Sequence, residues 1–151
     1  MTDVLSAGQR SYCMSRIRGK DTKPEHVIRR GLFAMGFRYR LHERSLPGCP
    51  DLVFPRYKAA IFVNGCFWHG HECDLFRWPN TNGQFWRKKI LGNKRNDKRN
   101  LENLGSAGWR TLLVWECAIR GRQKLSQTRL LARVAKWLLS KQTHTNIAGI
   151  T

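Results

Sequence analysis

AAIFVNGCFWHGHEC, residues 59–73, joins a run of apolar residues to a turn rich in cysteine, histidine and aromatic side chains. The apolar run is typical of a strand buried on both faces, so we place it centrally in a sheet. The turn holds two thiols, two imidazoles and two large aromatic rings within nine residues. This combination predicts a turn that binds a metal and also presents an apolar surface.

Three candidate metal ligands stand in this turn with the spacing C-x4-H-x-C: Cys66, His71 and Cys73. A closed structural zinc site has four ligands, so a fourth must come from elsewhere. Cys117 is the best candidate, because it follows a predicted strand at residues 111–115 that would lie in the same sheet. Other side chains could replace single ligands: Asp74 or Glu72 for Cys117, and His69 for His71. Buried thiols without metal are the competing interpretation.

The charge of the chain points to a polyanionic partner. Its 151 residues include 28 Lys and Arg against 10 Asp and Glu, a formal net charge of +18. Nucleic acid is the expected partner, although charge alone also fits a ribosome-associated or merely soluble basic protein. With 41% hydrophobic residues, the chain is expected to fold as one globular domain spanning 1–151.

No secretory signal and no membrane-spanning run are found in the sequence, so we expect a cytoplasmic, nucleoid-associated protein without membrane contact. Five cysteines are an odd number for a reducing compartment. Metal ligation or burial therefore explains them better than disulfides.

Alternation and capping signals predict an α/β fold. Strands are expected at residues 37–41, 52–54, 58–63 and 111–115, and helices at 11–18, from Pro24 to Met35, at 84–104 and at 126–140. The 84–104 helix is crowded with cations that repel one another unless phosphate neutralises them. Residues 1–20 are expected to form a DNA-contacting arm with a short helix, and 141–151 a flexible tail.

Asp51 is the candidate for a catalytic carboxylate. It follows Pro50, precedes an apolar strand and is expected near the end of the next strand. Nucleases of the PD-(D/E)xK kind hold Mg²⁺ with a carboxylate in this position, where the ion polarises the scissile phosphate. The second half of that pattern is missing, because the next strand ends in Val63-Asn64-Gly65. An ordinary turn residue is the competing interpretation.

His69 and its aromatic neighbours are the other candidates for function. A neutral imidazole held in a metal-tied turn can orient or deprotonate a water. Phe67 and Trp68 are adjacent and can hardly both face one core, so at least one is expected outside. An exposed ring on a basic surface can stack on bases or wedge between them.

Three motifs together resemble the very-short-patch repair (Vsr) DNA mismatch endonuclease family: LPGCPD at 46–51, GCFWHGHEC at 65–73 and VWECA at 114–118. The resemblance runs from about residue 11 to 137. It implies a restriction-endonuclease-like fold, a mixed central sheet flanked by helices with a structural zinc site. It also implies a Mg²⁺-dependent enzyme that nicks duplex DNA 5′ to the mispaired T of a T·G mismatch, the product of 5-methylcytosine deamination.

The same resemblance implies a role for each site residue. Asp51 would bind Mg²⁺, Val63 would offer it a backbone carbonyl, and Glu25 would approach the metal-bound waters. His69 would hold or activate the attacking water, and the zinc ligands would be Cys66, His71, Cys73 and Cys117. Three rings would intercalate beside the mismatch from the major groove: Phe67, Trp68 and Trp86. Met14 and Ile17 would approach from the minor groove. Lys89 and Asn93 would lie close to the mismatched bases.

One position departs from the family pattern. Asn64 stands where the family often carries a second active-site histidine, and an amide can hydrogen-bond a water but cannot carry a proton near neutral pH. A monomer is expected, with mismatch-repair proteins as possible partners. Two rival functions remain: a zinc-stabilised nucleic-acid-binding module without catalysis, and a restriction-type endonuclease that cuts paired sites.

Overall fold

The computed structural model describes residues 23–150, which are built around a five-stranded sheet in the order β1-β2-β3-β4-β5. The strands are β1 (Arg40–Leu41), β2 (Leu52–Phe54), β3 (Ala59–Asn64), β4 (Arg110–Trp115) and β5 (His144–Ile147). β1, β2 and β3 pair antiparallel, whereas β3, β4 and β5 pair parallel. The mixed sheet confirms the α/β class, and the almost complete burial of β3 confirms its predicted central position.

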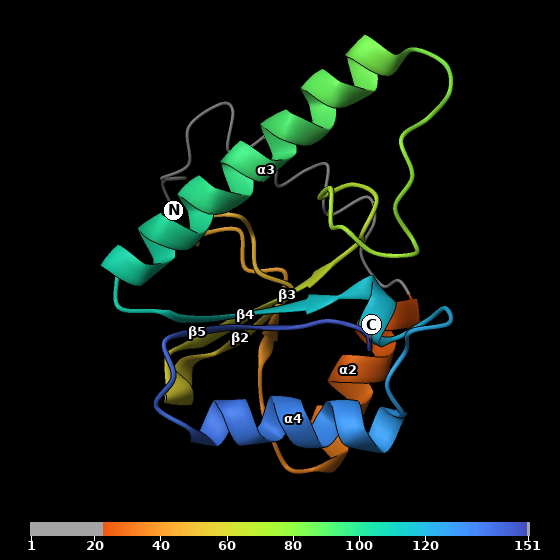
Figure 1. Cartoon of the computed structure of the whole chain (residues 1–151). Coiled ribbons are helices and arrows are strands. Elements are labelled where there is room, and N and C mark those ends of the chain that lie inside the picture. The colour runs from red at the N-terminus through yellow and green to blue at the C-terminus, as the bar shows by residue number, and fades with distance from the viewer. Residues whose placement is uncertain (1–22, 151) are drawn as a thin grey trace.

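Helices cover both faces of the sheet. α2 (Lys23–Ala34) and α4 (Gln127–Leu139) lie on one side, and α3 (Gly83–Ser106) crosses the other (Figure 1). Two short 3-10 helices follow β2 and β4: η1 (Pro55–Tyr57) and η2 (Glu116–Ala118). The N-terminal half of α3 projects beyond the sheet in Figure 1, and its basic side chains Arg87, Lys88 and Lys89 are exposed. Among residues 23–150, no helix combines the length and the apolar character needed to cross a bilayer.

The core has two layers, one on each side of the sheet. The larger layer packs α2 and α4 against the strands, with Ile28, Leu32 and Val134 fully buried. The smaller layer lies under α3 and includes Phe62, together with two cysteines of the predicted metal site. The metal site is therefore continuous with the hydrophobic packing between α3 and the sheet.

Two expectations at the level of elements need correction. The strand predicted at 37–41 is only Arg40–Leu41, because Phe37 turns into the core and packs edge-on against Phe54 with ring centroids 6.3 Å apart. The tail expected to be flexible at 141–151 contains β5, which pairs with β4 and buries Ile147. The expected arm at 1–20 and helix at 11–18 lie outside the described residues.

Candidate active site and metal centre

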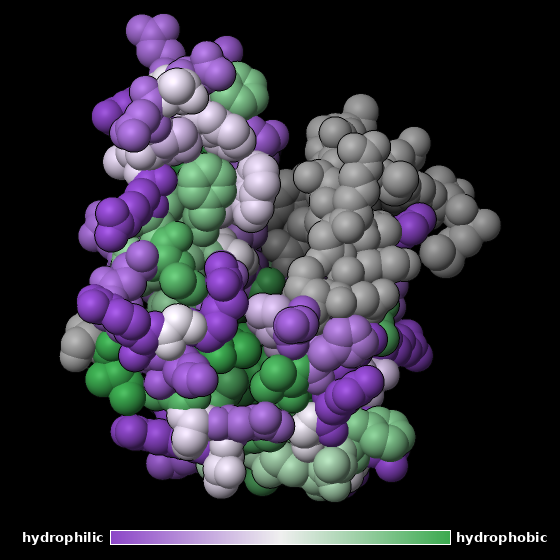
Figure 2. All heavy atoms as spheres, turned by 90° about the vertical axis from the view of Figure 1, so that its right-hand side faces the viewer, coloured by the Kyte–Doolittle hydropathy of each residue, from purple (hydrophilic) through white to green (hydrophobic). Residues whose placement is uncertain are grey.

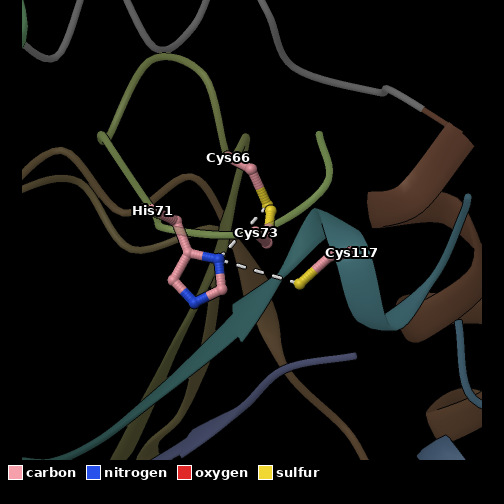
Figure 3. Close-up of side chains that lie close together, drawn as sticks. All are labelled: Cys66, His71, Cys73 and Cys117. Atoms are coloured by element: carbon pink, nitrogen blue, oxygen red, sulfur yellow. Dashed lines mark hydrogen bonds between the residues drawn. The ribbon is translucent and has the colours of Figure 1, made fainter. Parts of the chain in front are cut away.

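Four side chains converge beside the end of the central strands (Figure 3): Cys66, His71, Cys73 and Cys117. Three of them come from the turn after β3, and Cys117 comes from η2 after β4. The Cys66 and Cys117 sulfurs lie 3.6 Å and 3.7 Å from His71 Nδ1. The structure thus brings together the four predicted ligands, with donor atoms all within 4.8 Å of one another.

The donor set of this cluster fits zinc. Zn–S bonds of about 2.3 Å and Zn–N bonds of about 2.0 Å at a tetrahedral ion place sulfur and nitrogen about 3.6 Å apart. Desolvation by burial raises the pKa of the Cys66 and Cys117 thiols, so without a cation they are protonated at neutral pH. Desolvation also lowers the pKa of His71, which favours the neutral ring that a metal needs. A divalent ion would bind here with release of thiol protons.

Neighbouring groups hold these ligands in place. The His71 ring stacks on Trp115 with centroids 4.2 Å apart and planes 11° from parallel. Backbone N–H groups of Leu75 and Gly149 donate to the Cys73 and Cys117 sulfurs at 3.4 and 3.2 Å. Such outer contacts orient metal ligands and stabilise thiolate charge.

Asp51 lies at the start of β2, with only 6% of its surface exposed. Its Oδ2 accepts a hydrogen bond of 2.7 Å from the backbone N–H of Val63 in the neighbouring strand β3. The predicted position of Asp51 next to the end of the third strand is therefore confirmed. A carboxylate that served only an ordinary turn would not need to be buried and hydrogen-bonded to the neighbouring strand.

Glu25 lies on α2 and is 3% exposed, in spite of its charge. Arg29 Nη1 donates to Glu25 Oε2 at 3.0 Å, and His42 Nε2 lies 2.9 and 3.0 Å from the two carboxylate oxygens. One donor atom from each of Glu25, His42 and Asp51 falls within 4.8 Å of the others. Two buried carboxylates this close favour a divalent cation between them, so the residues present fit Mg²⁺.

His69 is 8% exposed and pairs with α3. Its Nδ1 lies 2.5 Å from Asp97 Oδ2. A carboxylate can only accept, so this bond puts the Nδ1 proton between the two groups and leaves the lone pair on Nε2. Asn64 is also buried, and it lines a small cavity together with Asp97. The ring of His69 is thereby fixed between the turn and α3.

The aromatic side chains of the turn form a cluster with the N-terminal part of α3. Phe67 packs edge-on against Trp68 and Trp86, with ring centroids 5.3 and 5.4 Å apart. The ring centroids of Trp68 and Trp86 lie 5.9 Å apart. Trp68 is 49% exposed, which confirms that at least one ring of the pair faces outward. Asn93 donates to the Trp68 carbonyl at 2.9 Å and so braces the turn. Figure 2 shows hydrophilic and hydrophobic side chains next to one another on one face of the molecule.

Two contacts of the site were not expected from the sequence. Asp97 is one of two acidic residues in a basic helix, and this isolated negative charge was the only available signal. His42 stands in a turn after a strand of two residues and belongs to no recognisable motif.

Met14 and Ile17 lie outside the described residues. Cys49 forms a disulfide, against the expectation for the cysteines, and its partner is not among the described residues.

Comparison with known proteins gives consistent matches. Residues 2–75 match the family model described as DNA mismatch endonuclease Vsr. The chain is 43% identical over 138 residues to the DNA mismatch endonuclease Vsr of Escherichia coli, covering 91% of this chain and 88% of the relative. It is 44% identical over 119 residues to the type II nicking enzyme V.XorIIP of Xanthomonas oryzae, covering 79% of this chain and 88% of that one. A type II nicking enzyme of Neisseria meningitidis, V.NmeAIP, is 40% identical over 122 residues, or 81% and 87% of the two chains.

Proposed function

This chain belongs to the DNA mismatch endonuclease Vsr family, and on that premise we propose that it nicks one strand of duplex DNA 5′ to the mispaired T of a T·G mismatch. Deamination of 5-methylcytosine produces this mismatch, so the proposed role is very-short-patch repair on the nucleoid. We further propose that the sheet is of the restriction-endonuclease-like, PD-(D/E)xK type.

One observation carries the proposal: β3 links the buried carboxylate of Asp51 to the turn that carries the exposed Trp68. Asp51 accepts a hydrogen bond from the backbone N–H of Val63. Three residues after Val63, at Cys66, the chain enters the turn that holds the candidate metal ligands and Trp68. A wedge that detects a distorted base step and a group that cleaves the backbone would thus share one rigid strand. A module that only bound nucleic acid would gain nothing from buried carboxylates at this place.

Mg²⁺ is the proposed catalytic cofactor. Asp51 would hold the ion directly, Val63 would contribute its backbone carbonyl, and Glu25 would contact the waters of the ion. When bound, Mg²⁺ would polarise the scissile phosphate and stabilise the charge that develops on its oxygens. The bond from the Val63 N–H fixes one oxygen of Asp51, so the carboxylate is oriented before DNA arrives.

His69 is the proposed general base. Asp97 holds the ring by Nδ1, which leaves Nε2 as the nitrogen that accepts a proton from the attacking water. Asp97 also stabilises the imidazolium that forms after proton transfer, and it is therefore a positioning residue. Asn64 lies beside this pair and would hydrogen-bond a water or a phosphate oxygen without taking its proton.

Replacing Asp97 by asparagine should lower the maximal nicking rate by about a hundredfold. The amide removes the negative charge, and it can present an N–H group to Nδ1 that favours the wrong tautomer of His69. Single-turnover rates on a mismatched duplex, measured between pH 6 and 9, would show the lower plateau and a shifted acidic limb. Affinity for DNA and zinc content should stay at parental values. A rate and a pH profile equal to the parent's would remove Asp97 from the mechanism.

The aromatic cluster of Phe67, Trp68 and Trp86 is the proposed wedge. A mismatched step is easier to unstack than a paired one, so insertion of a ring is least costly where recognition is needed. Lys89 and Asn93 on α3 would lie close to the mismatched bases. Met14 and Ile17 are proposed to approach from the minor groove.

Truncation of Trp68 to alanine should weaken binding to a T·G duplex by about ten- to a hundredfold, the range expected for loss of one stacked ring. Binding to a paired duplex should change much less, because it rests on phosphate contacts. Fluorescence anisotropy with both duplexes at one salt concentration measures the two effects. Leu139 on α4 is 68% exposed on the opposite side of the sheet, and Leu139→Ala is the matched control. Equal losses on both duplexes would contradict a wedge.

Zn²⁺ is the proposed ion of the Cys66, His71, Cys73 and Cys117 cluster, with a structural role. Four protein ligands would leave no open position for a substrate. The ion would stiffen the turn that carries both His69 and Trp68. Since His71 stacks on Trp115, the same ion would also tie the turn to β4.

The test of the function is a nicking assay on three duplexes of one sequence that contain a T·G mismatch, a T·A pair or a C·G pair. Each strand carries its own label, and the reactions contain Mg²⁺ or EDTA. We expect a single nick in the T strand of the mismatched duplex with Mg²⁺ alone. Cleavage of both strands of paired DNA would instead identify a restriction-type enzyme. Binding without cleavage would identify a binding module.

The remaining proposals concern assembly. We propose that the enzyme acts as a monomer in the cytoplasm, with mismatch-repair proteins assisting it. Light scattering on the enzyme alone and with a mismatched duplex tests the monomer, since a 1:1 complex and a dimer differ in mass.

A further inference from the structure

We infer that His42 is a direct ligand of the catalytic cation, through Nε2, so that the active site is a mixed nitrogen and oxygen site. The inference deepens the proposed function, because it rests on Asp51 as a metal ligand. His42 Nε2 lies 2.9 and 3.0 Å from the two oxygens of Glu25. This hydrogen-bonded pair lies next to Asp51, because one donor atom from each of Glu25, His42 and Asp51 falls within 4.8 Å of the others. A cation bound by His42 Nε2 and an oxygen of Asp51 would therefore have Glu25 beside it, in the position proposed for contact with its waters.

The backbone holds His42 at this position. Its N–H donates to the carbonyl oxygen of Asp51 at 3.0 Å, so the two residues lie side by side at the end of the β1–β2 pair. His42 adopts a φ of 49°, a left-handed conformation that is uncommon for residues other than glycine. In this conformation its ring meets Glu25 on α2, and one donor atom from each of Glu25, His42 and Asp51 falls within 4.8 Å of the others.

Charge and burial agree with a cation between these groups. Glu25 and Asp51 are almost fully buried, and His42 is partly buried. Arg29 binds one oxygen of Glu25 and balances one of the two negative charges. A neutral imidazole adds a donor without adding charge, so the cluster keeps an attraction for a divalent ion.

The chemistry of the ligand predicts a shift in metal preference. Mg²⁺ strongly prefers oxygen ligands, whereas the transition-metal ion Mn²⁺ accepts an imidazole nitrogen more readily than Mg²⁺ does. Loss of His42 should thus weaken binding of Mn²⁺ by roughly tenfold or more, the scale on which even outer partners of metal ligands act. Binding of Mg²⁺ should change less, which raises the ratio of Mg²⁺ to Mn²⁺ affinity.

Mn²⁺ electron paramagnetic resonance on the DNA-free, zinc-loaded protein tests this inference. Zinc fills the cysteine cluster first, so that Mn²⁺ cannot bind His71 and give ¹⁴N coupling from that ring. Titration of the free Mn²⁺ signal gives the affinity, and pulsed spectra give the coupling to ligand ¹⁴N. We expect ¹⁴N coupling in the parent, its loss with about tenfold weaker binding in His42→Asn, and no change in His144→Asn. Asparagine tolerates positive φ, which makes it the better replacement at position 42.

His42→Gln serves as a second variant in case the first does not fold, and zinc content and circular dichroism check both. A parent protein without ¹⁴N coupling, or a coupling that persists in a folded position-42 variant, would overturn the inference. The nicking assay is independent of this readout. Nicking of T·G duplexes without ¹⁴N coupling would exclude His42 as a ligand and support the proposed function. Coupling without nicking would support His42 as a ligand and contradict the proposed function.

Discussion

Asp51→Asn should abolish detectable nicking, with a loss of about a thousandfold or more in the single-turnover rate. Stabilisation of a phosphoryl transition state by a metal is worth several kcal/mol, and about 4 kcal/mol corresponds to a thousandfold. Asparagine has the shape of aspartate, and its oxygen can still accept the hydrogen bond from the Val63 N–H. The variant therefore removes the charge that holds the ion and retains the contact between β2 and β3.

Binding of DNA separates this loss from a general defect. Removal of a negative charge close to the phosphate backbone should leave affinity for the mismatched duplex unchanged or slightly higher. Asp74→Asn is the matched control, because Asp74 is an exposed carboxylate paired with Arg122. It should nick at the parental rate. Parental nicking by Asp51→Asn would remove Asp51 from the catalytic mechanism, and lost binding or lost folding would assign it a structural role.

The fold could be predicted where a pattern is local. The continuous apolar run at 59–63 and the basic helix beginning near Gln84 can each be recognised from their own residues, and both are present as β3 and α3. The tail at 141–151 has no such pattern. Its strand β5 exists because the edge of β4 offers a parallel partner and because Ile147 packs into the core. Tertiary pairing of this kind cannot be seen in a polar sequence segment.

The candidate site divides in the same way. Cys66, His71 and Cys73 are recognisable because a turn brings them together at short spacing, and Cys117 because it follows a predicted strand. His42 and Asp97 contribute through contacts that span 17 and 28 residues of sequence. Spacing gives no information on such pairs, because helix α2 meets the sheet and α3 meets the turn only in the folded chain.

Loss of zinc should have the largest effect on stability. Cys73→Ser replaces one thiolate ligand with a hydroxyl that binds zinc poorly, so zinc content after purification should fall from about one ion per chain to near zero. In such sites the free energy of zinc binding contributes directly to the free energy of folding. A loss of at least about 3 kcal/mol would lower the Tm of a chain of this size by roughly 10 °C. Metal analysis and thermal melting measure the two effects.

Glu72→Gln is the matched control, since Glu72 is exposed, immediately precedes Cys73 and was an alternative ligand in the sequence. It should retain zinc and Tm. Activity should fall in Cys73→Ser even well below its Tm, because the same turn carries His69 and Trp68. Zinc occupancy of the parent should also fall as the pH is lowered, since burial raises the pKa of Cys66 and Cys117 and protons compete with the ion for their sulfurs. A folded Cys73→Ser protein with full zinc content and parental Tm would remove Cys73 from the proposed zinc site.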